Sequence, residues 1–369
     1  SFGSLHGADS KTVRILYIVQ QFGGPSGNWG SRPFEQSTRL AQKYGHQVTV
    51  LCGRFDRASD ADVEAARATG VEVIQAPILL AQRQSYPRRI WTYARFMRWA
   101  QSTAKHLPRP DVILASSPPL TVGNMAAKVA RYQQIPFGFE VRDLWPELPE
   151  AVGALNHPIL KLAARRMAHR VYEAADHVVA LSDGMKERIP LWGVDPRRIT
   201  VVSNASDNGL FGGREQRDAI RTRMGWDKQF VCLYPGSMGF MNGLDYCLDC
   251  AKILDARGIT DIHLALMGDG ARREHLAARI RDEGIRSAAL YDAVTKRDMP
   301  GYLSAADIGI SCFLPIPPME ANSANKYFDF LSAGLPVVIN YGGWQATALR
   351  ETGAGVSVDG HRPEAMADA

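Results

Sequence analysis

The chain has 369 residues, of which 46% are hydrophobic and 22% are charged, and its formal net charge is +5. This composition is typical of a globular protein and excludes a disordered or fibrous chain, while the length favours two domains. The mild positive charge suits an anionic substrate or a membrane surface. No run approaches the roughly 18 apolar residues of a membrane span, and no signal peptide is visible. The five cysteines are scattered and odd in number, which is no disulfide framework, so we expect a protein of the reducing cytoplasm.

The first half of the chain alternates short apolar runs with longer amphipathic segments, which is the pattern of βαβ units with a parallel sheet. The expected strands are residues 14–19, 47–51, 71–75, 112–115, 137–140, 177–180 and 199–201. After a polar, glycine-rich linker at 204–213 the pattern restarts, with strands at 230–234, 263–267, 308–311 and 336–339. We therefore predict an α/β protein with two doubly wound parallel-sheet domains, residues 1–207 and 208–369.

The loop after the first strand, QQFGGPSGNWGSR, is rich in glycine and should lie at the top of the first sheet. Trp29 and Arg32 are candidates for stacking on a sugar and for binding an anion. A plain solvent-exposed loop is the alternative.

Residues 81–110 contain seven Arg or Lys and no Asp or Glu. On the helix expected within Arg88–Lys105, the face opposite the apolar stripe carries arginines together with Trp91 and Trp99. Aromatic and cationic side chains on one face are typical of a helix that binds a membrane surface. The alternative is that the tryptophans pack on a neighbouring element and the arginines are only solvated. We expect no nucleic-acid binding, because no recognised motif accompanies the patch.

The segment FEVRDLWPE follows the fifth expected strand, so Arg142, Asp143 and Trp145 should emerge at its carboxyl end. Asp143 could orient an acceptor hydroxyl or take its proton, and Arg142 could bind a phosphate with two hydrogen bonds. A buried ion pair without chemistry is the alternative.

The stretch Asn322–Val338, NSANKYFDFLSAGLPVV, joins a helix to a buried strand. Asn322 or Ser323 is the expected N-cap, and Gly334 should end the helix. A helix N-terminus favours a phosphate, Lys326 adds a full positive charge, and Asp329 could accept hydrogen bonds from ribose hydroxyls. An amphipathic helix with a solvated polar face is the alternative.

This stretch resembles the donor-site helix of family 4 glycosyltransferases, which have the GT-B fold, and it is most similar to bacterial enzymes that build O-antigen, capsule and exopolysaccharide. The segments DLWPE, YPGSMGFMNGLD and MGDGARRE are also similar to that family. The resemblance implies an N-terminal acceptor domain that faces a C-terminal nucleotide-sugar domain across a cleft. It also implies further C-terminal helices beyond residue 369.

The resemblance assigns roles to individual residues. It implies that Asp143, Lys326 and Glu320 are catalytic. It implies a donor site made of Gly236, Ser237, Met238, Gly239, Gly268, Arg272, Val294, Asn325, Lys326 and Asp329. It implies an acceptor site made of Gly23, Gly24, Trp29, Arg32, Arg142 and Trp145.

The chain departs from the family pattern at three positions. Ser237 and Asn242 stand where many members have a phosphate-binding Arg and Lys, and Ala321 stands where the first acid of an E-x7-E motif is expected. Glu320 lies one residue away and could take that role. Lys326 would then carry more of the diphosphate charge.

The resemblance therefore implies a retaining glycosyltransferase that moves a sugar from a nucleotide sugar, with UDP favoured, to a polyprenyl-diphosphate-linked saccharide at the inner face of the plasma membrane. We expect no cofactor or metal, because Asp60-Ala-Asp62 is interpreted as a solvated helix start, and Cys247 and Cys250 are interpreted as packing residues. The alternatives are a nucleotide-sugar 2-epimerase and a non-catalytic membrane or polyanion binder. The sequence leaves the sugar, the nucleotide, the acceptor and the oligomeric state open.

Overall fold

The computed structural model describes residues 11–27, 30–55, 57–80, 86–153, 155–213 and 216–369. Among these residues a seven-stranded sheet has the order β3-β2-β1-β4-β5-β6-β7. Its strands are β1 (Arg14–Val19), β2 (Gln47–Arg54), β3 (Glu72–Leu79), β4 (Val112–Ser116), β5 (Phe137–Val141), β6 (His177–Ala180) and β7 (Ile199–Val201). The helices between them are α1 (Arg32–Gln42), α2 (Arg57–Arg67), α3 (Tyr86–His106), α4 (Leu120–Gln133), α5 (Glu147–Ala151), α6 (Pro158–Ala174) and α7 (Asp183–Arg188).

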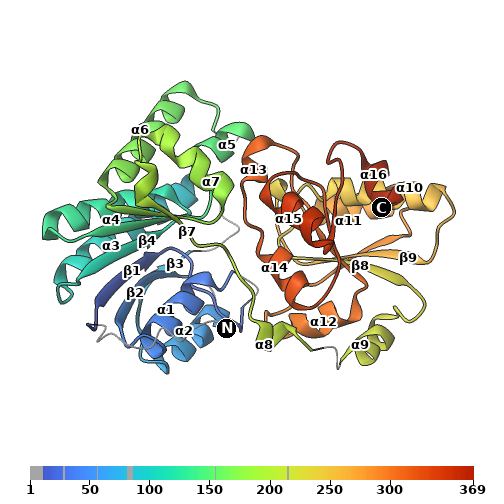
Figure 1. Ribbon diagram of the computed structural model, residues 1–369, viewed down its shortest axis with the longest axis horizontal. Coiled ribbons are helices and arrows are strands. Elements are labelled where there is room, and N and C mark those ends of the chain that lie inside the picture. The colour runs from blue at the N-terminus through green and yellow to red at the C-terminus, as the bar shows by residue number, and fades with distance from the viewer. Residues whose placement is uncertain (1–10, 28–29, 56, 81–85, 154, 214–215) are drawn as a thin grey trace. The chain divides into compact units, whose positions relative to one another are not determined.

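The first sheet is doubly wound around β1. This strand pairs in parallel with β2 on one side and β4 on the other, so the chain reverses its direction of winding between them. Helices α1 and α2 lie on one face of β1–β3, and α3 and α4 lie on the other (Figure 1). Because both faces are covered, β1 is apolar almost throughout, and its last five residues are buried. Ligands of such sheets bind beyond the carboxyl ends of the strands at the point where winding reverses.

A second parallel sheet has the order β10-β9-β8-β11-β12-β13 within the described residues. Its strands are β8 (Phe230–Pro235), β9 (Ile262–Met267), β10 (Ala288–Tyr291), β11 (Ile308–Ser311), β12 (Val337–Ile339) and β13 (Gly355–Ser357). The helices of this part are α8 (Asn208–Phe211), α9 (Arg217–Met224), α10 (Asp245–Ala256), α11 (Arg273–Asp282), α12 (Met299–Ala305), α13 (Pro317–Glu320), α14 (Asn325–Ser332), α15 (Trp344–Thr352) and α16 (Pro363–Asp368).

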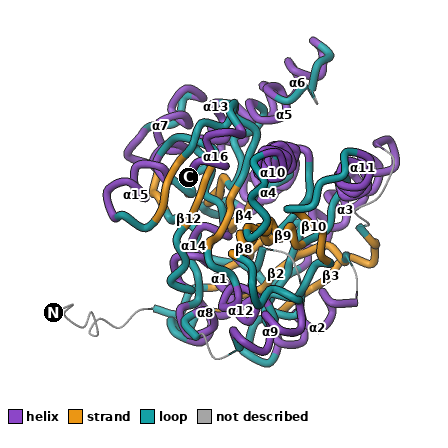
Figure 2. Tube along the Cα trace, turned by 90° about the vertical axis from the view of Figure 1, so that its right-hand side faces the viewer, coloured by secondary structure: helices purple, strands orange, loops and turns teal. Residues whose placement is uncertain are grey.

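Alternate residues of the second sheet enter two separate cores. Val231 and Leu233 of β8 pack in the core that includes Phe330, whereas Cys232 and Tyr234 pack in the core that includes α10. Figure 2 shows β8, β9 and β10 side by side, with α9 and α12 on one side and α10 and α11 on the other. The sequence prediction of an α/β fold with two parallel sheets is confirmed.

By its contacts the chain divides into two compact units, and neither is one continuous segment. The first unit comprises residues 1–24, 31–141 and 169–178, and the second comprises 25–30, 142–168 and 179–369. The predicted boundary after residue 207 falls inside the second unit and stays a prediction. The prediction missed β10 and β13, the two edge strands of the second sheet, most of whose residues are half-buried or exposed, so that they carry a weaker apolar signal.

Candidate active site

Helix α14 begins without a side-chain cap. Its first residue is Asn325 and its N-cap residue is Ala324, which has no polar side chain, so the predicted cap at Asn322 or Ser323 is wrong. Asn322 caps the amide of Ser323 instead, at 2.7 Å, and the buried Ser323 hydroxyl has no hydrogen-bond partner within the described chain. No side chain at the N-cap therefore satisfies the first amides of α14 in the described chain, and amides at such a position can bind an anionic acceptor. At the other end, Gly334 follows the helix with φ of 66°, as predicted.

Lys326, in the first turn of α14, places its ammonium among uncharged groups. Its Nζ donates to the hydroxyl of Tyr234 at 3.0 Å and lies 4.1 Å from the centroid of that ring. Removal from water lowers the pKa of Lys326 to about 8. No carboxylate of the described residues forms an ion pair with it. A partly desolvated cation without an anionic partner is the expected feature of an anion-binding site.

Two glycine loops meet next to Lys326. An added Cβ at Gly236 would lie 3.2 Å from Cε of Lys326, and one at Gly268 would lie 1.8 Å from the carbonyl oxygen of Gly236. An added Cβ at Gly270 would lie 2.6 Å from the carbonyl oxygen of Met238. Side chains at Gly268 and Gly270 would therefore push the loop after β9 away from the loop after β8.

Two backbone amides of the loop after β8 are already hydrogen-bonded to the end of β9 and the loop after it. Gly236 donates to Met267 O at 2.9 Å and Met238 donates to Asp269 O at 2.8 Å, so these two amides are occupied. The Met238 side chain is also fully buried, so the prediction that its amide binds a ligand is not supported. Gly268 is similar, because its amide donates to Tyr291 O. Ser237 is exposed, and it remains a candidate for ligand binding together with Gly239.

Arg272 does not offer an unpaired charge to a phosphate. Its guanidinium binds the carboxylate of Asp245 at 2.8 Å, and His275 and Arg279 bind the same carboxylate. Although burial opposes it, these hydrogen bonds lower the pKa of Asp245 to about 2. Arg272 therefore links α11 to α10, and its predicted contact with the donor stays a prediction.

Asp329 is held by the segment that precedes α8. Its carboxylate accepts a hydrogen bond from the Ser206 hydroxyl at 2.6 Å. Burial raises the pKa of Asp329, against the smaller opposing effects of Ser206 and of the positive charge on Lys296. Asn204 binds the carbonyl oxygen of Ser323 at 2.6 Å, so the same segment also fixes the entry to α14. The sequence prediction had not anticipated either contact.

For the predicted catalytic residue Glu320 and the predicted donor residues Val294 and Asn325, the described structure gives no contact that defines a role. Glu320 ends α13 and is exposed, and an added Cβ at Gly342 would lie 3.3 Å from its carboxylate. Val294 is half-buried against the core that contains Phe330. Asn325 is exposed at the start of α14. Their parts in donor binding stay predictions.

In the first unit, the loop after β1 is fixed by a buried acid. Gly23 and Gly24 are both buried, and the amide of Gly24 donates to the carboxylate of Asp62 at 2.7 Å. Asp62 is fully buried, so its interpretation as part of a solvated helix start is wrong. A buried carboxylate needs such hydrogen bonds to offset its desolvation. The predicted contact residue Trp29 lies outside the described residues.

Arg32 is part of a buried network at the carboxyl ends of β1, β4 and β5. Its Nε binds the carboxylate of Glu140 at 2.9 Å, and the two side chains are 9% and 1% exposed. Glu140 also accepts hydrogen bonds from Gln36 and from the hydroxyls of Ser116 and Tyr17. Arg32 is thus paired with a buried acid of the same unit, and its predicted contact with an external anion stays a prediction.

Arg142, Asp143 and Trp145 directly follow β5 and are half-buried. Burial raises the pKa of Asp143, and the positive charge of Arg142 opposes this effect. A carboxyl group with a raised pKa is suited to hold a proton near a reacting hydroxyl. The roles of these three residues in acceptor binding stay predictions.

The basic helix α3 exposes Trp91 and the arginines that the structure describes, whereas Trp99 of the same predicted face is half-buried. Phe96 and Ala100 are fully buried, whereas Arg88, Trp91, Arg95 and Arg98 are exposed. Arg95 covers the Trp91 ring at 4.6 Å, and Trp99 packs near Phe96. The part of the chain that the structure describes contains no helix that is long and apolar enough to cross a membrane.

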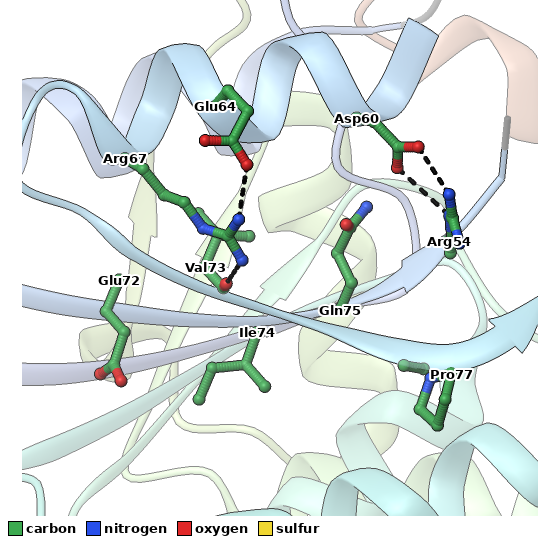
Figure 3. Close-up of a pocket in the computed structure, with 10 residues that line it drawn as sticks. Arg54, Asp60, Glu64, Arg67, Glu72, Val73, Ile74, Gln75 and Pro77 are labelled. Atoms are coloured by element: carbon green, nitrogen blue, oxygen red, sulfur yellow. Dashed lines mark hydrogen bonds and ion pairs between the residues drawn. The ribbon is translucent and has the colours of Figure 1, made fainter. Parts of the chain in front are cut away.

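An open pocket of about 890 Å³ lies between α2 and β3, and Figure 3 shows its lining. Arg54 binds Asp60 at 2.7 Å, and Arg67 binds Glu64 at 2.6 Å. These two ion pairs involve four of the five charged side chains of the pocket, and the fifth, Glu72, accepts a hydrogen bond from Thr49 at 2.8 Å. None of the predicted donor, acceptor or catalytic residues lines it, so we do not assign the active site there.

Two sequence families match the chain. Residues 34–205 match the family described as "Glycosyl transferase 4-like domain", and residues 229–369 match "Glycosyl transferases group 1".

A D-inositol 3-phosphate glycosyltransferase from Thermomonospora curvata is 26% identical over 226 residues, which are 53% of this chain and 48% of that protein. One from Xylanimonas cellulosilytica is 27% identical over 217 residues, 54% of this chain and 48% of that protein. The chain thus matches about half the length of these relatives.

Solved structures share the fold. The Anabaena protein HepE in complex with UDP-glucose has a TM-score of 0.70 at 17% identity, with 96% of this chain and 88% of that chain covered. WaaG, a glycosyltransferase involved in lipopolysaccharide biosynthesis, has a TM-score of 0.67 at 16% identity, with the same coverage. The fold and the two family matches agree with the sequence motifs quoted above. The chain belongs to glycosyltransferase family 4.

Proposed function

We propose that this glycosyltransferase takes a sugar from a nucleotide sugar, of which a UDP-sugar is the favoured donor, and transfers it to a lipid-linked saccharide. The observation that carries the donor assignment is the ammonium of Lys326. It is partly desolvated, has no carboxylate partner among the described residues, and stands in the first turn of the uncapped helix α14. A diphosphate supplies the missing negative charge.

The geometry suits stabilisation of a departing diphosphate. An ammonium has three N–H donors, and Lys326 uses one of them for Tyr234. The other N–H groups, the first amides of α14 and the exposed Ser237 loop can stabilise the negative charge that develops on the leaving phosphate. We expect this to proceed without a metal, and the described residues contain no group of three or more potential ligands that could hold one. Asp329 is assigned to the ribose.

The favoured nucleotide and the stereochemistry rest on family likeness. HepE is a protein of the same fold that has been solved with UDP and with UDP-glucose, which supports a uridine nucleotide here. Retention of the anomeric configuration is expected from the resemblance to family 4.

For the acceptor we propose Asp143 as the residue that orients the attacking hydroxyl, with Arg142 and Trp145 beside it. The buried Gly23 and Gly24 shape the loop after β1. A polyprenyl-diphosphate-linked saccharide would require the protein to reach a membrane surface, and the exposed arginines and Trp91 of α3 suit an anionic bilayer. We therefore propose that the protein acts at the inner face of the plasma membrane.

Calorimetric titration with UDP, GDP, ADP and CMP tests the donor assignment. We expect UDP to bind best, and Lys326→Ala to weaken its binding by about 10- to 100-fold, which corresponds to the loss of a hydrogen bond to a charged group. Lys252→Ala is the matched control, because Lys252 pairs with Glu283 on the surface of α10. Absence of binding by any nucleotide to the wild-type protein would overturn the proposal.

Product analysis separates transfer from epimerisation. A transferase needs an acceptor to consume the UDP-sugar at full rate, whereas a 2-epimerase converts the nucleotide sugar without one. NMR of UDP-N-acetylglucosamine incubated with the protein alone should therefore show no 2-epimer.

Sedimentation with vesicles containing phosphatidylglycerol tests the membrane contact. Arg95→Glu/Arg98→Glu should reduce the bound fraction. Lys228→Glu/Arg286→Glu makes the same change in net charge at exposed positions of the second unit and should bind as the wild type does. Equal binding by all three proteins would remove α3 from the proposal.

A further inference from the structure

Tyr234 connects the two groups that the proposed donor site uses. It lies near the end of β8 and its side chain is fully buried. Its hydroxyl donates to the carbonyl oxygen of Ser237 at 2.8 Å and accepts from Nζ of Lys326 at 3.0 Å. One hydroxyl thus holds the glycine loop on one side and the ammonium on the other.

The direction of these hydrogen bonds follows from the chemistry of a phenol. A tyrosine hydroxyl has one proton to donate and lone pairs to accept with. Because the carbonyl oxygen of Ser237 can only accept, the Tyr234 hydroxyl donates its one hydrogen to it. The lone pairs of the Tyr234 oxygen then accept from the ammonium of Lys326. Burial raises the pKa of Tyr234, which keeps the hydroxyl protonated for this arrangement.

Within the described parts of the chain, the other neighbours of Lys326 provide no directional contact. Phe313 contributes the face of a ring at 5.8 Å, and Gly236 contributes only backbone. The thiols of Cys247 and Cys312 are the titratable groups that act on its charge, besides the tyrosine itself. Contact with a ring holds a cation over a face without fixing its N–H directions. The hydroxyl of Tyr234 is the contact that directs the ammonium.

We propose that Tyr234 is a positioning residue of the donor site. It holds the ammonium of Lys326 and the backbone at Ser237 at a fixed distance from each other, so that both can contact the same diphosphate. This inference rests on the proposed function. A phenylalanine would fill the same space in the core, so packing alone does not require the hydroxyl at this position.

Tyr234→Phe tests the proposal, because it keeps the ring beneath the ammonium and removes both hydrogen bonds. We expect the affinity for UDP to fall by about 10-fold. Tyr246→Phe is the matched control. Tyr246 is buried in the same core, and its hydroxyl binds Asp359 O and Arg362 O, away from Lys326.

A titration without any nucleotide separates positioning from packing. The NMR signal of the Lys326 ε-carbon should titrate at lower pH in Tyr234→Phe than in the wild type, because the charged form loses its acceptor. Tyr246→Phe should leave that midpoint unchanged, even where it lowers the melting temperature.

The outcomes distinguish this inference from the proposed function. Wild-type affinity for UDP and an unchanged Lys326 midpoint in Tyr234→Phe would overturn the positioning role and leave the donor assignment intact. Absence of nucleotide binding by the wild-type protein would overturn both.

Discussion

Gly268 lies directly against the carbonyl oxygen of Gly236, so that a Cβ on Gly268 would sit 1.8 Å from that oxygen. Real Cβ atoms do not approach an oxygen so closely. The oxygen belongs to the backbone of Gly236, so it cannot move aside as a flexible side chain could. The close approach sets the spacing between the loops after β8 and β9. Gly236 in turn lies next to Lys326, since an added Cβ at Gly236 would be 3.2 Å from Cε of Lys326. The position of the ammonium therefore depends on Gly268, which need not touch a ligand.

Gly268→Ala should therefore destabilise the fold and weaken nucleotide binding. We expect a loss of about 1–3 kcal/mol in the free energy of unfolding, the usual cost of overpacking, measured by urea denaturation. UDP affinity should fall as the loop after β8 shifts.

Gly284→Ala is the control for this change. Its φ of 65° is also positive, but an added Cβ would meet nothing within 4 Å. It should cost about 1 kcal/mol through backbone strain and leave UDP affinity unchanged. Equal effects of both variants would show that the contact between Gly268 and Gly236 carries no energetic weight.

Glu140→Ala should be severely destabilising, because it removes the carboxylate of a buried ion pair with Arg32. Breaking a buried ion pair costs about 3–5 kcal/mol. Thermal and urea unfolding would measure the loss. Asp60→Ala breaks the exposed pair with Arg54, and it should cost less than about 1 kcal/mol. A small effect of Glu140→Ala would contradict the assignment of Arg32 as a structural residue.

Binding of UDP-glucose should weaken as the pH rises above about 8. The pKa of Lys326 in the free protein is lowered to about 8, so its ammonium is increasingly neutral at higher pH. A bound diphosphate favours the charged form, and binding in this range must then take up a proton. Calorimetry between about pH 7 and 10 should show falling affinity in the wild type and a flatter profile in Lys326→Met. A flat profile in the wild type would contradict the placement of Lys326 at the phosphates.

The cysteines should be unreactive while the protein is folded. All five are buried, and burial raises the pKa of Cys52 to about 12. Cys247 and Cys312 lie with their sulfur atoms 3.4 Å apart. Because the thiolate is the reactive form, a thiol-specific reagent such as dithionitrobenzoate should label the protein slowly in buffer and rapidly in urea. Rapid labelling in buffer would show that a core containing a cysteine opens readily in the folded protein.

Much of the architecture could be predicted from local pattern. The alternation of short apolar runs with longer amphipathic segments predicted the parallel strands and the restart of the pattern after residue 204. Each strand is buried on both faces, so its own sequence is apolar whichever strands it pairs with. The candidate donor helix was also visible, since Lys326, Asp329 and Gly334 lie within one short segment.

Pairing partners could not be predicted in the same way. Arg32 and Glu140 are 108 residues apart, and Gly24 and Asp62 are 38 apart, so nothing in the neighbouring sequence shows that the charge of Arg32 is neutralised or that Asp62 is buried. The same holds for Arg272, whose partner Asp245 is on another helix. A cationic or acidic residue in a loop has the same local sequence whether it binds a ligand or another part of the chain.

The sequence by itself determined the two parallel sheets, the helix that carries Lys326 and the membership in a glycosyltransferase family, because these depend on periodicity and on short contiguous motifs. Only the tertiary structure decided which charges are left for a ligand. It pairs Arg32 and Arg272 internally and leaves Lys326 beside Tyr234 without a described carboxylate partner. The physical reason is that the neutralisation and desolvation of a charge depend on groups that folding brings together from distant parts of the chain.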